Sequence, residues 1–141
     1  MRDKLLNLLG LMRKAGAIEL GETNTGNACR DGKAKVLLLA SDASDNAGRR
    51  AESFVNGRRT VLIRSPFTKE EISEKVGVGG CSMAALTALG FATAFLKGLA
   101  EIAPEQYGEA SENIETRLGK AVRRRKSTAA DKKKHQGKRE E

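Results

Sequence analysis

Residues 34–44 have the sequence AKVLLLASDAS, and this stretch decides the fold. The run VLLLA at 36–40 is short and wholly apolar, which is typical of a strand buried on both faces of a sheet. The polar residues that follow include Ser41 and Asp42, either of which can cap a helix. That helix repeats alanine every four residues, so one of its faces is apolar. A doubly buried strand that leads directly into an amphipathic helix indicates an α/β protein.

Helical and strand-like patterns alternate on either side of this stretch. Apolar residues at helical spacing predict helices at 3–14, 23–30, 43–54, 68–76 and 90–102. Short apolar runs predict strands at 17–20, 36–40, 60–63 and 83–86. Asp3 is the expected N-cap of the first helix, and Thr68 with Glu71 forms a capping box. Alternation at this spacing predicts a three-layer α/β/α sandwich around a small mixed four-stranded sheet.

The charge is distributed unevenly along the chain. Residues 1–116 contain 15 basic and 15 acidic side chains, whereas residues 117–141 carry the whole net charge of +8. A basic tail on a neutral body indicates an electrostatic partner, most often nucleic acid. A disordered tail that only aids solubility is the alternative. We therefore expect a domain at 1–103, ended by Pro104, and an acidic-then-basic tail at 104–141 that is partly helical or disordered, with disorder beyond about Thr128.

Cysteine, histidine and hydropathy patterns restrict the class of protein. Cys29 and Cys81 are distant in sequence, and two unpaired thiols without a signal peptide predict the reducing cytoplasm. No apolar stretch approaches the ~20 residues of a membrane span, so we expect no membrane partner. His135 is the only histidine and lies in the tail, which excludes a structural zinc site. We expect neither a metal nor a cofactor.

Two glycine-containing segments raise the possibility of an enzyme. Residues 21–27 (GETNTGN) have the glycine spacing of a phosphate-binding loop, but Asn27 stands where that loop needs lysine. The GVGG segment at 77–80 follows a helix and not a strand, so it is no dinucleotide fingerprint. Asp42 and Asp45 are more commonly caps than metal ligands, and the fold has no histidine for a catalytic triad. The sequence therefore predicts a protein without catalytic activity.

Four segments together resemble a known family. They are LLGLMRKAGAIELGE (8–22), GKAKVLLLASDASDN (32–46), FTKEEISEKVG (67–77) and MAALTALGFATAFLKGL (83–99). In these segments, which cover about residues 4–100, the chain resembles the bacterial YlxQ-type branch of the ribosomal "L-seven-Ae" family. The resemblance implies a three-layer α/β/α fold that binds kink-turns, which are sharp RNA bends flanked by sheared G·A pairs.

The resemblance also implies a two-part contact surface for RNA. The first part is the start of the second helix, where the matching positions are Gly21, Glu22, Thr23, Asn24 and Asn27. The second part is the loop before the last strand, whose small residues are Gly79, Gly80, Cys81 and Ser82. Three nearby lysines are expected to reach phosphates: Lys33, Lys35 and Lys69. Further phosphate contacts are expected from the tail residues Arg123, Arg124, Arg125, Lys126, Lys132, Lys133 and Lys134.

These observations leave two main functions open, and a metabolite-binding or RNA-modifying enzyme is a distant third. The first is a non-catalytic, ribosome-associated RNA-binding protein, a monomer whose partners are ribosomal or other kink-turn RNA and ribosomal proteins. The second is a protein-interaction module of the same fold, tethered to RNA by its basic tail. Thr23, Asn24 and Asn27 favour the second, because they replace the Asn, Glu and Lys of the family pattern.

Overall fold

The computed structural model describes the backbone of residues 1–140 and the side chains of residues 1–124. All four expected strands are present, with ends that differ from the expected ones by at most one residue. In chain order the elements are α1 (Arg2–Ala15), β1 (Ile18–Leu20), α2 (Glu22–Arg30), β2 (Val36–Leu39), α3 (Asp45–Val55), β3 (Val61–Arg64), α4 (Lys69–Val76), β4 (Met83–Leu86), α5 (Leu89–Ile102) and α6 (Pro104–Glu140).

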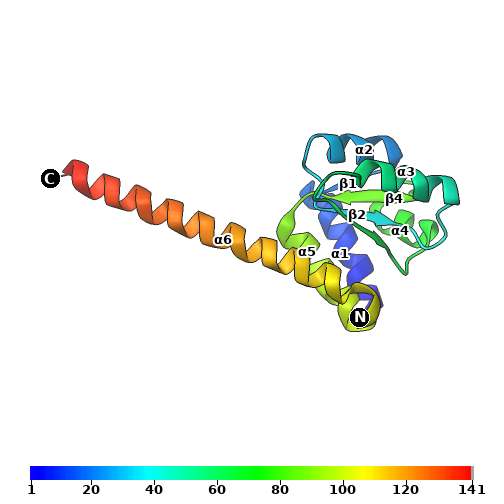
Figure 1. Ribbon diagram of the computed structural model, residues 1–141. Helices are drawn as coiled ribbons and strands as arrows, with labels where there is room; N and C mark the ends of the chain where they lie inside the picture. The colour runs from blue at the N-terminus through cyan, green and yellow to red at the C-terminus, as the bar shows by residue number, and fades with distance from the viewer. Residues whose placement is uncertain (141) are drawn as a thin grey trace.

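The four strands form one sheet in the order β1-β4-β2-β3. β2 and β3 are parallel, whereas β4 runs antiparallel to both β1 and β2. Helices α2 and α3 cover one face of the sheet, and α1, α4 and α5 cover the other (Figure 1). The expected three-layer sandwich around a mixed sheet is therefore confirmed.

Strand β2 explains why a wholly apolar run lies at the centre of the sequence. Val36 and Leu38 belong to the core beneath α1, α4 and α5, whereas Leu37 and Leu39 belong to the core beneath α2 and α3. All four side chains are buried, because successive side chains of a strand point to opposite faces. The predicted burial of both faces is confirmed.

The helix after β2 starts later than the sequence predicts. Ser44, and neither Ser41 nor Asp42, caps α3 by accepting a hydrogen bond from the Ala47 N–H at 3.1 Å. The helix begins at Asp45, so the expected start at residue 43 is wrong. Asp42 instead accepts from the Lys69 N–H at 2.8 Å, which satisfies a free amide at the start of α4. This contact ties the carboxyl end of β2 to α4.

The starts of α1 and α4 are held together. The predicted capping box of Thr68 and Glu71 is present, with both hydrogen bonds at 3.1 Å. Glu71 also accepts two hydrogen bonds of 2.7 Å from Arg2, whose guanidinium lies 4.8 Å from the centre of the Phe67 ring. The Thr68 N–H, assisted by the Arg2 charge, keeps the pKa of Glu71 below its usual value. The N-cap of α1 is Met1 and not the expected Asp3.

Helix α6 belongs in part to the folded body. Tyr107 and Ile114 are buried in the main core, and the Tyr107 hydroxyl donates to the Arg64 carbonyl at 2.6 Å. The packed core therefore continues past residue 103, because Pro104 begins a helix rather than ending the domain. α6 then projects from the body and remains helical past Thr128, where the sequence predicts disorder (Figure 1). Between residues 1 and 140, no helix is both long and apolar enough to cross a membrane.

Candidate nucleic-acid interface

The two parts of the expected contact surface meet at one end of the sheet. Gly21 directly follows β1 and Ser82 directly precedes β4, and these strands pair antiparallel with Leu20 opposite Ala84. The Gly21 N–H donates to the Met83 carbonyl at 3.1 Å. The first turn of α2 therefore lies beside the loop at 77–82, which only the resemblance had associated with it.

The start of α2 has donors that the protein leaves available. Gly21, at the N-cap position, has φ 86° and ψ 166°, a conformation that only glycine adopts readily. A Cβ atom at this position would meet no protein atom within 4 Å. Among the described side chains and backbone, the N–H groups of residues 22–24 have no acceptor. Free amides at a helix start attract phosphate and carbonyl oxygens.

Most polar side chains of this turn already have partners. Glu22 forms an ion pair with Arg50 of α3, and Asn27 accepts a hydrogen bond from Arg30. The Asn24 side-chain NH₂ donates to the Leu20 carbonyl at 2.9 Å, which leaves its oxygen for a ligand. Thr23 is exposed. Arg50 is a basic residue beside the site that the sequence pattern does not predict, because it lies on another helix.

The loop before β4 presents a smaller surface than expected. Gly79 and Gly80 are exposed and Ser82 is half-buried, but Cys81 is only 1% exposed. Cys81 is packed in the core, its N–H donates to the Ser73 hydroxyl at 3.2 Å, and burial raises the pKa of its thiol. The prediction that Cys81 contacts a base is therefore wrong, because its side chain lies in the core and not at the surface. The apolar side chain that is exposed in this loop is Val78.

Two basic residues approach the same end of the sheet. Lys69 begins α4, and its backbone N–H donates to Asp42, which follows β2. Arg64 ends β3 and donates to the Ala40 and Ser41 carbonyls at 3.4 and 3.2 Å. The parallel pairing of β2 and β3 is the signal that could have identified Arg64, because parallel strands end at the same edge.

Lys33 and Lys35 lie at the opposite end of the sheet. Both follow the end of α2, and the Lys35 N–H donates to the carbonyl of Leu86, the last residue of β4. The structure therefore does not bring them together with Gly21. Arg123 and Arg124 are exposed on α6. The remaining expected tail contacts lie on the backbone of α6, but their side chains are outside the described part: Arg125, Lys126, Lys132, Lys133 and Lys134.

One buried hydroxyl on α2 has no hydrogen-bond partner. Thr25 is fully buried, and its Oγ1 contacts no donor or acceptor among the described residues. We expect Thr25→Val to raise the free energy of unfolding by about 1 kcal/mol, because it removes a desolvated hydroxyl and preserves the shape. Urea unfolding of the purified protein measures this change.

Thr93 is the matched control for this substitution. Its Oγ1 donates to the Leu89 carbonyl at 2.8 Å, so Thr93→Val removes an existing hydrogen bond and should destabilise by about 0.5–1.5 kcal/mol. A loss of stability in Thr25→Val as large as that in Thr93→Val would mean that the Thr25 hydroxyl has a partner in solution.

Comparison with known proteins places this arrangement in a family. A curated relative, the RNA-binding protein YlxQ of Enterococcus faecium, is 33% identical over 76 residues, which cover 54% of this chain and 73% of the relative. The chain belongs to the YlxQ family. No family model matches the sequence. A solved structure of a protein with unknown function from Bacillus halodurans has a TM-score of 0.62 at 19% identity and covers 70% of this chain and 97% of its own, which shows the shared fold.

The site of this YlxQ-family chain has the chemistry of binding. It offers the free N–H groups at the start of α2, the Asn24 side-chain oxygen and nearby basic residues. These groups surround Gly21, whose backbone a ligand can approach closely. Within the described residues, no group of three histidine, cysteine or acidic side chains is arranged to hold a metal ion. Asp42, which the sequence offers as a cap or a metal ligand, accepts its hydrogen bond from the Lys69 N–H.

Proposed function

We propose that this protein is a non-catalytic, cytoplasmic, ribosome-associated RNA-binding protein that recognises kink-turn-like RNA at the start of α2. The observation that supports it most is the environment of Gly21. Its empty Cβ position adjoins the free amides of α2 and the exposed loop at 78–80. The name of the Enterococcus faecium relative, an RNA-binding protein, supports RNA as the partner.

Each group of this site has a role in the proposed complex. The amides of residues 22–24 bind phosphate or carbonyl oxygens of the bent strand. The Asn24 amide oxygen accepts from a guanine donor, and Gly21 lets the RNA backbone approach. Val78 and the adjoining glycines form a small apolar surface for an unstacked base. Lys69 supplies charge at the rim of the site.

The alternative is a protein-interaction module of the same fold that is tethered to RNA by α6. Two observations favour it. Glu22 and Asn27 are engaged by arginines of the protein itself. Met1, the N-cap residue of α1, and Leu11 within α1 are each 54% exposed and offer an apolar surface on the opposite side of the sheet from α2. This alternative requires RNA binding that does not distinguish a kinked RNA from a regular one.

A binding titration of the full-length protein separates the two functions. One RNA is a hairpin with a kink-turn, and the other has the same hairpin with its G·A pairs replaced by Watson–Crick pairs. We expect at least a tenfold preference for the kink-turn, about 1.4 kcal/mol. Cosedimentation with ribosomes tests the expected association. Equal affinity for both RNAs would reject kink-turn recognition and favour the interaction module.

Substitution of Gly21 tests whether the preference for kink-turn RNA arises at the start of α2. We expect Gly21→Val to remove most of the preference, because a side chain there fills the open approach to α2. Gly16→Val is the matched control, since Gly16 also has a positive φ, 68°, and an empty Cβ position, but lies between α1 and β1. Both substitutions should cost about 1–3 kcal/mol of backbone strain, so a preference lost equally in both would reflect folding alone.

A further inference from the structure

A strongly basic hollow lies at the end of the sheet opposite Gly21. Its volume is about 430 Å³. Six of the twelve residues that line it are cationic, and none is acidic. We call these six residues the basic groove: Lys35, Arg58, Arg59, Arg117, Lys120 and Arg124. They come from the segments before β2 and β3 and from α6.

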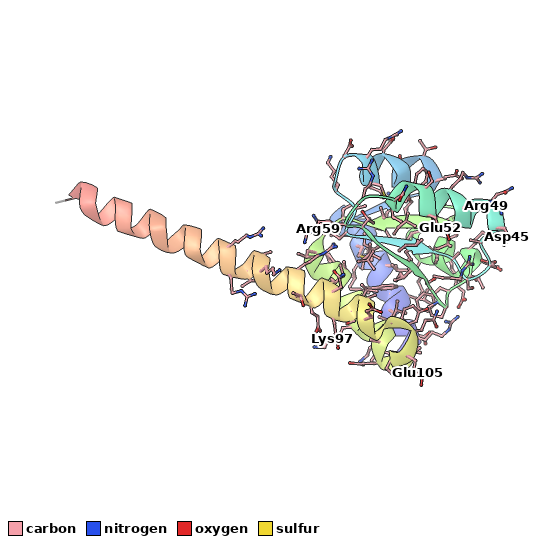
Figure 2. The ribbon with its side chains drawn as sticks, viewed as in Figure 1. Asp45, Arg49, Glu52, Arg59, Lys97 and Glu105 are labelled. Atoms are coloured by element: carbon pink, nitrogen blue, oxygen red, sulfur yellow. The ribbon has the colours of Figure 1, made fainter. Side chains whose placement is uncertain are left out.

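The basic groove is fixed by the fold. Arg117 of α6 donates to the Arg59 carbonyl, which fastens the helix to the turn before β3. Arg117, Lys120 and Arg124 are three and four residues apart, so they share one face of α6. Arg58 donates to the Arg30 carbonyl at 3.4 Å. Figure 2 shows Arg59 at the side of the body along which α6 departs.

Among the described residues that line this groove, none carries a negative charge. Burial, followed by the neighbouring charge of Arg59, lowers the pKa of Arg117. Like charges gathered along one groove create a local positive potential that attracts anions. Arginine is also the side chain whose planar guanidinium matches two phosphate oxygens at once. The chemistry of the groove is therefore that of a phosphate-binding surface.

We propose that the basic groove binds the sugar-phosphate backbone of RNA and forms a second RNA contact, separate from the start of α2. A polymer fits better than a single nucleotide, because the basic stretch of the sequence continues along the backbone of α6 beyond the groove. From Arg117 to Lys134, α6 advances about 25 Å at 1.5 Å per residue, which is several phosphate spacings. The inference rests on RNA as the partner in the proposed function, but it does not depend on kink-turn recognition.

This second contact changes how the protein engages RNA. The start of α2 lies at the carboxyl end of β2, whereas the basic groove lies at its amino end. One RNA must pass around the body to reach both surfaces, or two RNA segments must meet at the protein. In either case, affinity for regular duplex RNA depends on the groove, and the preference for a kink depends on Gly21.

The test measures binding of the full-length protein to a 20-base-pair regular RNA duplex at several salt concentrations. One variant neutralises groove side chains that make no hydrogen bond or ion pair in the described structure: Lys35→Gln, Arg59→Gln and Lys120→Gln. The matched variant removes the same charge from exposed lysines of α1 and α4: Lys4→Gln, Lys14→Gln and Lys75→Gln. Both variants should keep the unfolding midpoint of the parent protein.

We expect the groove variant to bind the duplex at least tenfold more weakly, and the matched variant less than threefold more weakly. The slope of log affinity against log salt should become shallower by about 2 to 3 in the groove variant, since each lost phosphate contact removes about 0.9. Its preference for a kink-turn over the Watson–Crick control should persist. The single substitution Lys120→Glu, at an exposed helix position, is an independent test. We expect it to weaken binding of the duplex at least fivefold.

Three results would overturn the inference. Equal loss in the groove and matched variants would mean that only net charge matters. Competition by millimolar GTP or ATP that releases the duplex from the parent protein would identify the groove as a nucleotide site. Binding of polyglutamate as tight as that of RNA, and lost in the groove variant, would identify an acidic protein partner. Loss of kink-turn preference with unchanged duplex affinity would instead contradict the proposed function.

Discussion

A chain that ends at residue 103 will be less stable than one that ends at residue 124 by about 3–6 kcal/mol, because it lacks two buried side chains that each contribute about 1.5–3 kcal/mol. Tyr107 and Ile114 are 3% and 0% exposed in the intact protein. Their removal opens the core over β3 and α5, and it also removes the Tyr107 hydrogen bond to Arg64. Since small domains have only about 5–15 kcal/mol of stability, the shorter chain should be largely unfolded or close to it.

Urea unfolding of the two chains measures this difference directly. In the full-length protein we expect Ile114→Ala to cost about 2–5 kcal/mol, as for other buried isoleucines. Val122→Ala on the same helix is the control, because Val122 is 40% exposed and should change stability by about 0.5 kcal/mol at most. If the two chains unfold at the same urea concentration and Ile114→Ala is neutral, then α6 does not pack on the body in solution.

The packing of α6 shows a limit of sequence reasoning. Tyr107, Ser111 and Ile114 are buried, and their spacing of three and four residues was present in the sequence. The sequence indicates a tail from residue 104, because Pro104 follows the last predicted core helix and the acidic composition of the segment after it does not distinguish the faces of a helix. These residues pack on an apolar surface of α5, and that surface exists only in the folded chain. By contrast, the run VLLLA predicted its strand correctly, because every residue of a strand that is buried on both faces is apolar.

The candidate site was predictable in part. Gly21 and the loop before β4 were associated through family resemblance, and antiparallel pairing of β1 with β4 brings them together. Lys33 and Lys35 were misplaced because they follow α2 closely in sequence, although a helix of nine residues carries the chain to the other end of the sheet. The basic groove could not be predicted, since its cations come from separate segments that only tertiary structure brings together.

We expect Gly98→Leu to reduce the free energy of unfolding by about 3 kcal/mol, at the upper end of the usual cost of overpacking a core. Gly98 lies where α5 crosses α1, and a Cβ atom there would be 2.4 Å from the Leu5 Cδ2. Leu5 is only 3% exposed, so its side chain has little room to move aside. The two helices must therefore separate, which loosens the layer that supports one face of the sheet.

Three further variants distinguish overpacking from a general effect of replacing glycine in a helix. Gly119→Ala in α6 should stabilise by up to about 1 kcal/mol, because its Cβ meets no atom within 4 Å and alanine favours the helix. Leu5→Ala alone should cost about 2–5 kcal/mol, but in the Gly98→Leu background it should cost less by about 1–3 kcal/mol, since it relieves the clash. Additive losses in the double variant would show that Leu5 and Gly98 are not in contact, and that the two helices pack elsewhere.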